Sequence, residues 1–138
     1  MKTAVRAGLA ALLAGATVLV APAQAATVVQ RTAVCQDGDF RGSFTLRYEA
    51  SGTSYHLIGG ITTSGPYIGD SAGTIALRIS YRSGTTVHTV YTRSVSTTTG
   101  STTFAMPSGT DVPIRSFGTA ATTFDNGVNS CVATVQLP

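Results

Sequence analysis

The sequence predicts an all-β protein, a single antiparallel β-sandwich of about seven to eight strands, immunoglobulin-like or of a related Greek-key type. Apolar and polar residues alternate along most of the chain after residue 25, and Gly, Ser, Asn and Asp recur between the alternating segments. No long stretch of that region has the three- and four-residue apolar spacing of a helix. A small barrel is the alternative arrangement.

The first 25 residues have the three parts of a secretory signal peptide. Lys2 and Arg6 form a basic start, Gly8–Val20 is apolar and uncharged, and Ala23-Gln24-Ala25 is a small-x-small cleavage site. A membrane anchor is the alternative, but the apolar run is shorter than the roughly 20 residues that a span requires. We therefore expect a signal peptide at 1–25 and a secreted, extracellular domain at 26–138 that has no membrane span.

Removal of the leader changes the interpretation of the charge. Without Lys2 and Arg6, seven of the nine basic residues remain, and they face six acidic residues. A nearly neutral domain gives no electrostatic reason to expect nucleic acid or a membrane surface as a partner.

Eight strands follow from the alternation. In the clearest of them, Phe40, Phe44 and Leu46 share one face while Arg41 and Thr45 share the other. The sequence Asp125-Asn126-Gly127 is a strong hairpin signal before the last strand. The predicted strands are Thr27–Cys35, Phe40–Ala50, Tyr55–Thr62, Ile75–Arg82, Thr85–Arg93, Ser101–Met106, Val112–Phe124 and Val128–Leu137.

Cys35 and Cys131 are the only two cysteines, and they fall in the first and last predicted strands. In a secreted chain this count predicts one disulfide, here joining the terminal strands. Antibody-type domains instead place their cysteines in two central strands around a Trp, and this chain has no Trp.

The stretch Gly69-Asp70-Ser71-Ala72-Gly73 fits the pattern G-x-S-x-G and resembles the nucleophile elbow of α/β-hydrolase enzymes. The resemblance would make Ser71 a nucleophile that needs a following helix and, later in the chain, an acid and then a histidine. A strand pattern follows instead, and His88 precedes Asp111 and Asp125. We therefore interpret the motif as a turn entering a strand, and we expect no catalytic residue.

Asp37, Asp39 and Asp125 are a candidate cation site. If the disulfide-bonded strands run antiparallel, Asp37 lies near Asn129, and Asp39 lies near Gly127 and the Asp125-Asn126 turn, so that carboxylate and amide oxygens converge. If the strands run parallel, no such cluster forms, and the residues belong to ordinary Asp-Gly turns.

No other motif points to a cofactor or to a catalytic centre. His56 and His88 have no matched carboxylate in the sequence, so we interpret both as surface residues. The chain contains no phosphate-binding loop, no zinc-protease helix motif and no dinucleotide fingerprint. We therefore expect no cofactor.

Pro66, Tyr67 and Ile68 form the candidate ligand-binding segment. They lie in a loop bounded by Gly65 and Gly69, and an aromatic-aliphatic loop tip can anchor a partner. The alternative is that the loop folds back over the end of the core.

Three classes of function are compatible with these observations. The preferred one is a secreted, non-catalytic binding domain for an unknown protein, glycan or small molecule. The alternatives are a structural β-domain of the cell envelope or matrix, and a small serine hydrolase that uses Ser71.

Overall fold

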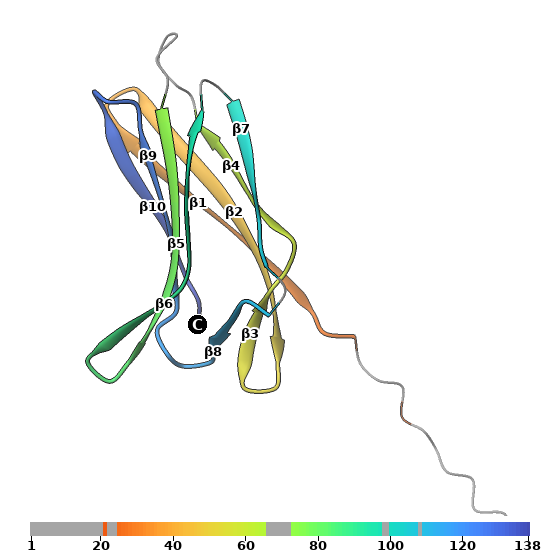
Figure 1. Ribbon diagram of the computed structural model, residues 1–138. Coiled ribbons are helices and arrows are strands. Elements are labelled where there is room, and N and C mark those ends of the chain that lie inside the picture. Colours follow the sequence, from red (N-terminus) through yellow and green to blue (C-terminus); the bar gives the residue numbers. More distant parts are fainter. Residues whose placement is uncertain (1–20, 22–24, 66–72, 98–99, 108) are drawn as a thin grey trace, which may run out of the picture.

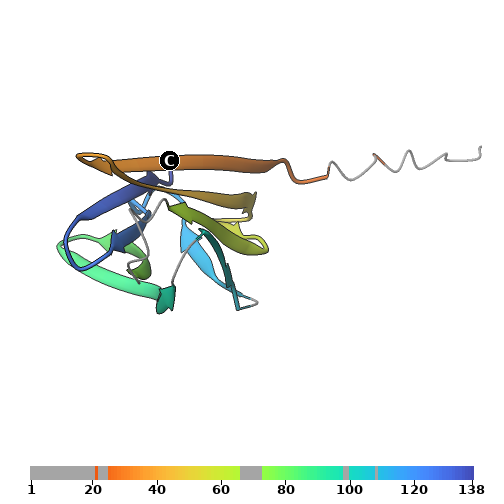
Figure 2. The same cartoon turned by 90° about the horizontal axis from the view of Figure 1, so that it is seen from above.

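The computed structural model describes residue 21 and residues 25–65, 73–97, 100–107 and 109–138. Within these residues the chain is all-β, with ten strands, no helix and two antiparallel sheets that face each other (Figures 1 and 2). The predicted sandwich is confirmed; the immunoglobulin-like topology stays a prediction. No helix in the described part of the chain is long and apolar enough to cross a membrane.

The larger sheet has six strands and the smaller has four. The larger has the order β7-β4-β2-β3-β8, with β1 paired along the other edge of β2, and the smaller has the order β10-β9-β5-β6. The bounds are β1 Val28–Asp37, β2 Phe40–Ser51, β3 Ser54–Leu57, β4 Gly60–Gly65, β5 Gly73–Ser83, β6 Thr86–Thr97, β7 Gly100–Ala105, β8 Asp111–Pro113, β9 Thr119–Asp125 and β10 Ser130–Gln136.

Two of the predicted strands are each divided in two, which accounts for ten strands in place of eight. The stretch 55–62 breaks at Gly59, which has a positive φ of 67°. The pairing with β2 changes register there, since Tyr48 faces Leu57 of β3 whereas Thr45 faces Thr62 of β4. The stretch 112–124 breaks at a loop in which Arg115 and Phe117 have positive φ angles. A strand cannot pass through that backbone conformation.

The core lies between the two sheets and follows the predicted alternation. Phe44 and Leu46 of β2 are buried against Ile75 and Leu77 of β5 and Phe124 of β9 in one apolar cluster. In each of the two sheets about every second residue of a strand points into this core, as expected for half-buried antiparallel strands. Burial of these large apolar side chains is the main source of stability of the sandwich.

The predicted disulfide is confirmed. Cys35 of β1 and Cys131 of β10 are bonded, with their Cα atoms 5.6 Å apart, and the bond joins one strand of each sheet. The two strands run antiparallel, because Asp37 accepts hydrogen bonds from the side chain of Asn129 and the amide of Ser130. The bond therefore closes the sandwich where its first and last strands meet.

Candidate functional site

The sandwich has two ends of different chemistry. The long strand β5 runs between them, since Thr74 pairs with Asp125 near one end and Arg82 approaches the β8–β9 loop at the other. Eight residues of extended chain separate these points, which is about 25–30 Å. No side chain spans that distance, so the two ends are separate candidate sites.

The acidic end consists of the β1–β2 turn with Asp37 and Asp39, and the β9–β10 turn with Asp125 and Val128. Bonds from Asn129 and Ser130 to Asp37 hold the two turns together. Asp125 accepts the amide of Gly127 at 2.6 Å, which fixes the conformation of the second turn. Val128 is 88% exposed at the tip of that turn.

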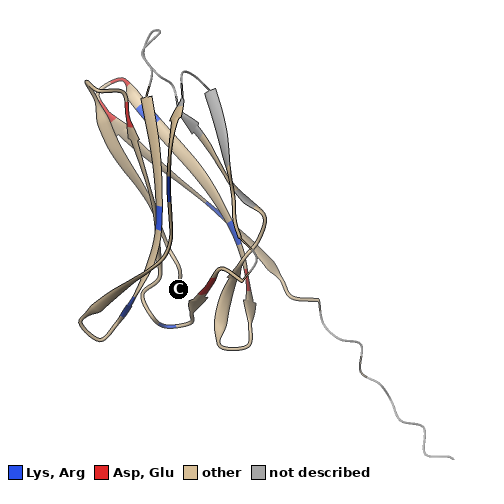
Figure 3. Cartoon of the chain, in the orientation of Figure 1, with Lys and Arg blue, Asp and Glu red and all other residues tan. Residues whose placement is uncertain are grey.

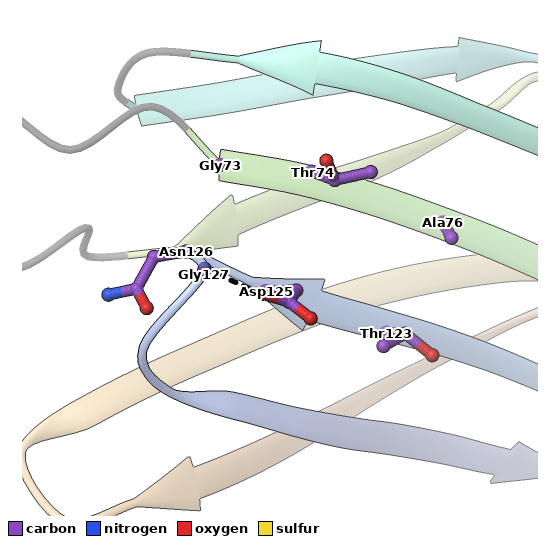
Figure 4. A pocket seen from close by; sticks show the side chains of 7 residues that line it. All are labelled: Gly73, Thr74, Ala76, Thr123, Asp125, Asn126 and Gly127. Atoms are coloured by element: carbon purple, nitrogen blue, oxygen red, sulfur yellow. Dashed lines mark hydrogen bonds between the residues drawn. The ribbon is translucent and has the colours of Figure 1, made fainter.

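An open hollow of about 500 Å³ lies beside the second turn (Figure 4). Its walls come from the start of β5, the end of β9 and the turn that follows β9: Gly73, Thr74, Ala76, Thr123, Asp125, Asn126 and Gly127. Short side chains and a single carboxylate line it, so it offers few groups that could hold a ligand firmly.

The described part of the chain contains no group of three His, Cys, Asp or Glu side chains that could hold a metal ion. Asp37 does lie beside Asn129, as the antiparallel arrangement predicts. However, the carboxylates of Asp37 and Asp125 accept N–H donors, which are partners of an ordinary turn rather than of a bound cation. The structure gives the candidate cation site no further support.

The basic end consists of the β5–β6 turn with Arg82 and Val87, and the β8–β9 loop with Arg115 and Phe117. The loop is anchored on both sides. The Arg82 amide donates to the Ser116 carbonyl at 2.8 Å, and the Leu137 amide donates to the Gly118 carbonyl at 2.8 Å. The loop is therefore fixed to the ends of β5 and β10.

The anchored loop holds two side chains outward in an unfavourable backbone conformation. Arg115 has φ +64° and Phe117 has φ +50°, in the left-handed region where a side chain costs about 1–2 kcal/mol per residue. Phe117 is 77% exposed, although burial would stabilise so large an apolar side chain. Strain of this kind persists only where the surroundings impose it, and it is concentrated at functional sites.

A second hollow, also of about 500 Å³, lies between these two segments. Tyr81 forms part of its wall and stacks on His88, with ring centroids 4.9 Å apart and planes 19° apart. Arg82 and Arg115 stand at its rim, and no salt bridge to either guanidinium is found among the described residues. The site therefore presents aromatic surface and two unpaired positive charges together.

The structure corrects the interpretation of His56 as a histidine without a matched carboxylate. His56 Nδ1 and Asp111 Oδ1 are 2.7 Å apart, and the two residues are cross-strand partners in β3 and β8. Glu49 of β2 occupies the same row of the sheet on the other side of His56. Fifty-five residues separate the pair, so no local pattern could have revealed it.

The His56–Asp111 pair resembles the base-orienting half of a catalytic triad, but that half does not act alone. A triad needs a nucleophile within hydrogen-bond reach of the other imidazole nitrogen. Among the described residues no hydroxyl or thiol makes such a contact. Both partners are partly exposed, which is also usual for an ordinary surface ion pair.

The predicted binding segment Pro66, Tyr67 and Ile68 lies outside the described residues, as does Ser71. The residues of the basic end were not predicted from sequence. One feature of the sequence could have indicated the loop. The turn-forming residues Ser116 and Gly118 flank Phe117 inside a stretch that otherwise has the pattern of a strand. Comparison of the chain with protein-family models, with curated proteins and with solved structures found no match.

Proposed function

We propose that this chain is an extracellular, non-catalytic binding domain and that the basic end is its binding surface. The observation that carries the proposal is Phe117, which is exposed on an anchored loop and lines one hollow together with Arg82 and Arg115. Neither arginine forms a salt bridge among the described residues. Aromatic and arginine side chains are the residue types most often responsible for binding energy at interfaces.

The chemistry of the basic end defines the ligand class. The guanidinium groups of Arg82 and Arg115 bind carboxylate, sulfate or phosphate groups through paired N–H donors. Phe117 and Tyr81 offer apolar surface next to these charges. The ligand should therefore carry an anionic group beside an apolar one.

Secretion is part of the proposal and rests on the leader at 1–25 and on the disulfide. A disulfide is stable in an oxidising compartment, and it is rare in the reducing cytosol. Among the described residues no hydroxyl or thiol contacts the His56 imidazole, which favours a binding role over a catalytic one. The structural β-domain remains the alternative if the basic end binds nothing.

The test is a titration of the ¹⁵N-labelled disulfide-bonded domain with naphthalene-2-sulfonate, which combines an aromatic surface with an anion. We expect amide shifts to concentrate at residues 81–84 and 113–117 and to saturate. A cationic naphthylmethylammonium probe of similar size should shift these amides at least about tenfold more weakly, because two arginines repel it.

Two variants complete the experiment. Phe117→Ser and the double change R82E/R115E should each reduce the affinity for the sulfonate, whereas R31E/R47E changes the net charge equally on another face and should not. Arg31 and Arg47 are exposed on β1 and β2, away from the site. Shifts scattered over the molecule, or equal binding by R82E/R115E, would contradict the proposal.

A further inference from the structure

The two ends of the molecule are complementary in charge and in shape. Figure 3 shows acidic positions in the turns at the upper end and arginines in the segments at the lower left. The acidic end carries the carboxylates of Asp37, Asp39 and Asp125, which are all exposed. The basic end carries the exposed side chains of Arg82 and Arg115.

Each end also has an exposed apolar residue among its charges. Val128 is 88% exposed at the tip of the acidic end, and Phe117 is 77% exposed at the basic end. Val87, which is cross-strand from Arg82, adds a third at 50%. An apolar group surrounded by charges of one sign fits best against an apolar group surrounded by the opposite sign.

The acidic end presents an exposed turn, and the basic end presents an open hollow. The β9–β10 turn projects at residues 126–129 and is stiffened by the side-chain oxygen of Asn126, which accepts the amides of Val128 and Asn129. The basic end has an open hollow of about 500 Å³ between its two segments. A rigid turn that enters a fixed hollow loses little conformational entropy on binding.

We propose that the basic end binds the acidic end of a second copy of this chain, so that molecules associate head to tail. This inference rests on the proposed function, because it names the partner of the same surface. The two ends of one molecule cannot meet, since β5 holds them about 25–30 Å apart. A contact between different surfaces on each copy is heterologous and does not close after two molecules, so it extends into a larger ring or an open chain.

The remaining charges at each end do not oppose this contact. Arg41 pairs in register with Gln36 beside the acidic turn, but three carboxylates outnumber it. At the basic end Asp111 of β8 is bound to His56, and Glu49 of β2 stands cross-strand to His56 on its other side, so both carboxylates lie beside one imidazole of the larger sheet. The charges at the two ends therefore attract each other, most strongly where salt does not screen them.

The test is sedimentation velocity on the disulfide-bonded domain across protein concentration and salt. We expect the average mass to rise beyond the dimer with concentration at about 10 mM salt, and to fall toward the monomer at about 1 M salt, where charges interact only over about 3 Å. The reversal R82E/R115E should weaken association by about tenfold or more, and so should D37R/D39R.

The two charge-reversed variants provide the decisive control. Each alone should remain monomeric, because both of its ends then carry the same sign, whereas an equimolar mixture should associate again. R31E/R47E should associate like the unchanged protein. Val128→Ser, at a position that is 88% exposed, should weaken association and keep the melting temperature.

Several results would overturn the inference. They are a wild-type protein that stays monomeric at low salt, a mass that stops at the dimer, or a mixture of the two reversed variants that remains monomeric. If self-association is absent while naphthalene-2-sulfonate still shifts residues 81–84 and 113–117, the partner is a different anionic molecule and the proposed function stands. If neither is seen, both proposals fail.

Discussion

The chain reverses direction at both the acidic and the basic end of the sandwich, but different residue types adopt the positive φ angles at the two ends. At the acidic end the residues with positive φ are glycines, Gly38 and Gly127, which adopt it without a steric penalty. At the basic end Gly84 of the β5–β6 turn does the same, but Arg115 and Phe117 of the β8–β9 loop adopt a positive φ with full side chains. One end is built without strain and is closed by a covalent bond, whereas the other keeps strain together with exposed aromatic and charged groups.

The difference between the ends indicates which part of this fold has a binding role. A turn whose positive φ angles fall on glycines costs the fold little stability, as at the acidic end. A loop that keeps an exposed phenylalanine in a strained conformation gives up stability, and such trade-offs are typical of functional sites.

Loss of the disulfide should destabilise the protein most. The change C35S/C131S removes a link that spans 96 residues, and the chain-entropy model assigns about 4–5 kcal/mol to a loop of that length. Urea denaturation of the variant and the native protein, followed by circular dichroism, measures the difference in unfolding free energy. Equal midpoints would show that the bond does not close the acidic end as inferred.

Next in size is Gly42→Ala, which adds one methyl group opposite Cys35. A Cβ built at Gly42 would lie 2.3 Å from Cδ2 of the buried Phe124 ring, so the ring would have to move. Overpacking of this kind costs about 1–3 kcal/mol. The control G42A/F124L removes the obstructing ring, so adding G42A to F124L should cost much less; an equal penalty in both backgrounds would locate the cause elsewhere.

The sequence predicts the acidic end well and the basic end poorly, for a physical reason. Alternation and the Asp125-Asn126-Gly127 turn are local signals, and the cysteine pair follows from a count, because the chain has only two cysteines; the structure confirms each of them. The β8–β9 loop instead departs from its own local preference. Its residues read as a continuing strand, and bonds from Arg82 and Leu137, distant in sequence, force the break.

The pairing of His56 with Asp111 was missed for the same reason. Cross-strand neighbours are set by register, and register between β3 and β8 depends on how the whole larger sheet is ordered. Alternation made no prediction for Asp111, which precedes the predicted strand Val112–Phe124, and His56 was expected only to lie at the surface. Alternation could not say which outward residues of other strands would stand beside them.

The smallest predicted effect separates strain from binding at the basic end. Phe117→Gly should raise the unfolding free energy by about 0.5–1 kcal/mol, since relief of about 1–2 kcal/mol of strain exceeds the added entropy of a glycine in the unfolded chain. Phe117→Ala is the matched control, because it removes the same exposed ring but keeps the Cβ that causes the strain. Its stability should equal that of the native protein.

Both changes should weaken naphthalene-2-sulfonate binding alike, because both remove the aromatic surface between Arg82 and Arg115. Thermal melts and the amide titration, run on the same three proteins, measure stability and binding independently. If Phe117→Gly does not exceed Phe117→Ala in stability, the loop is unstrained, and the contrast between the ends reduces to charge. If it does, the loop holds its phenylalanine outward at a measurable loss of stability, as expected of a surface whose role is contact with another molecule.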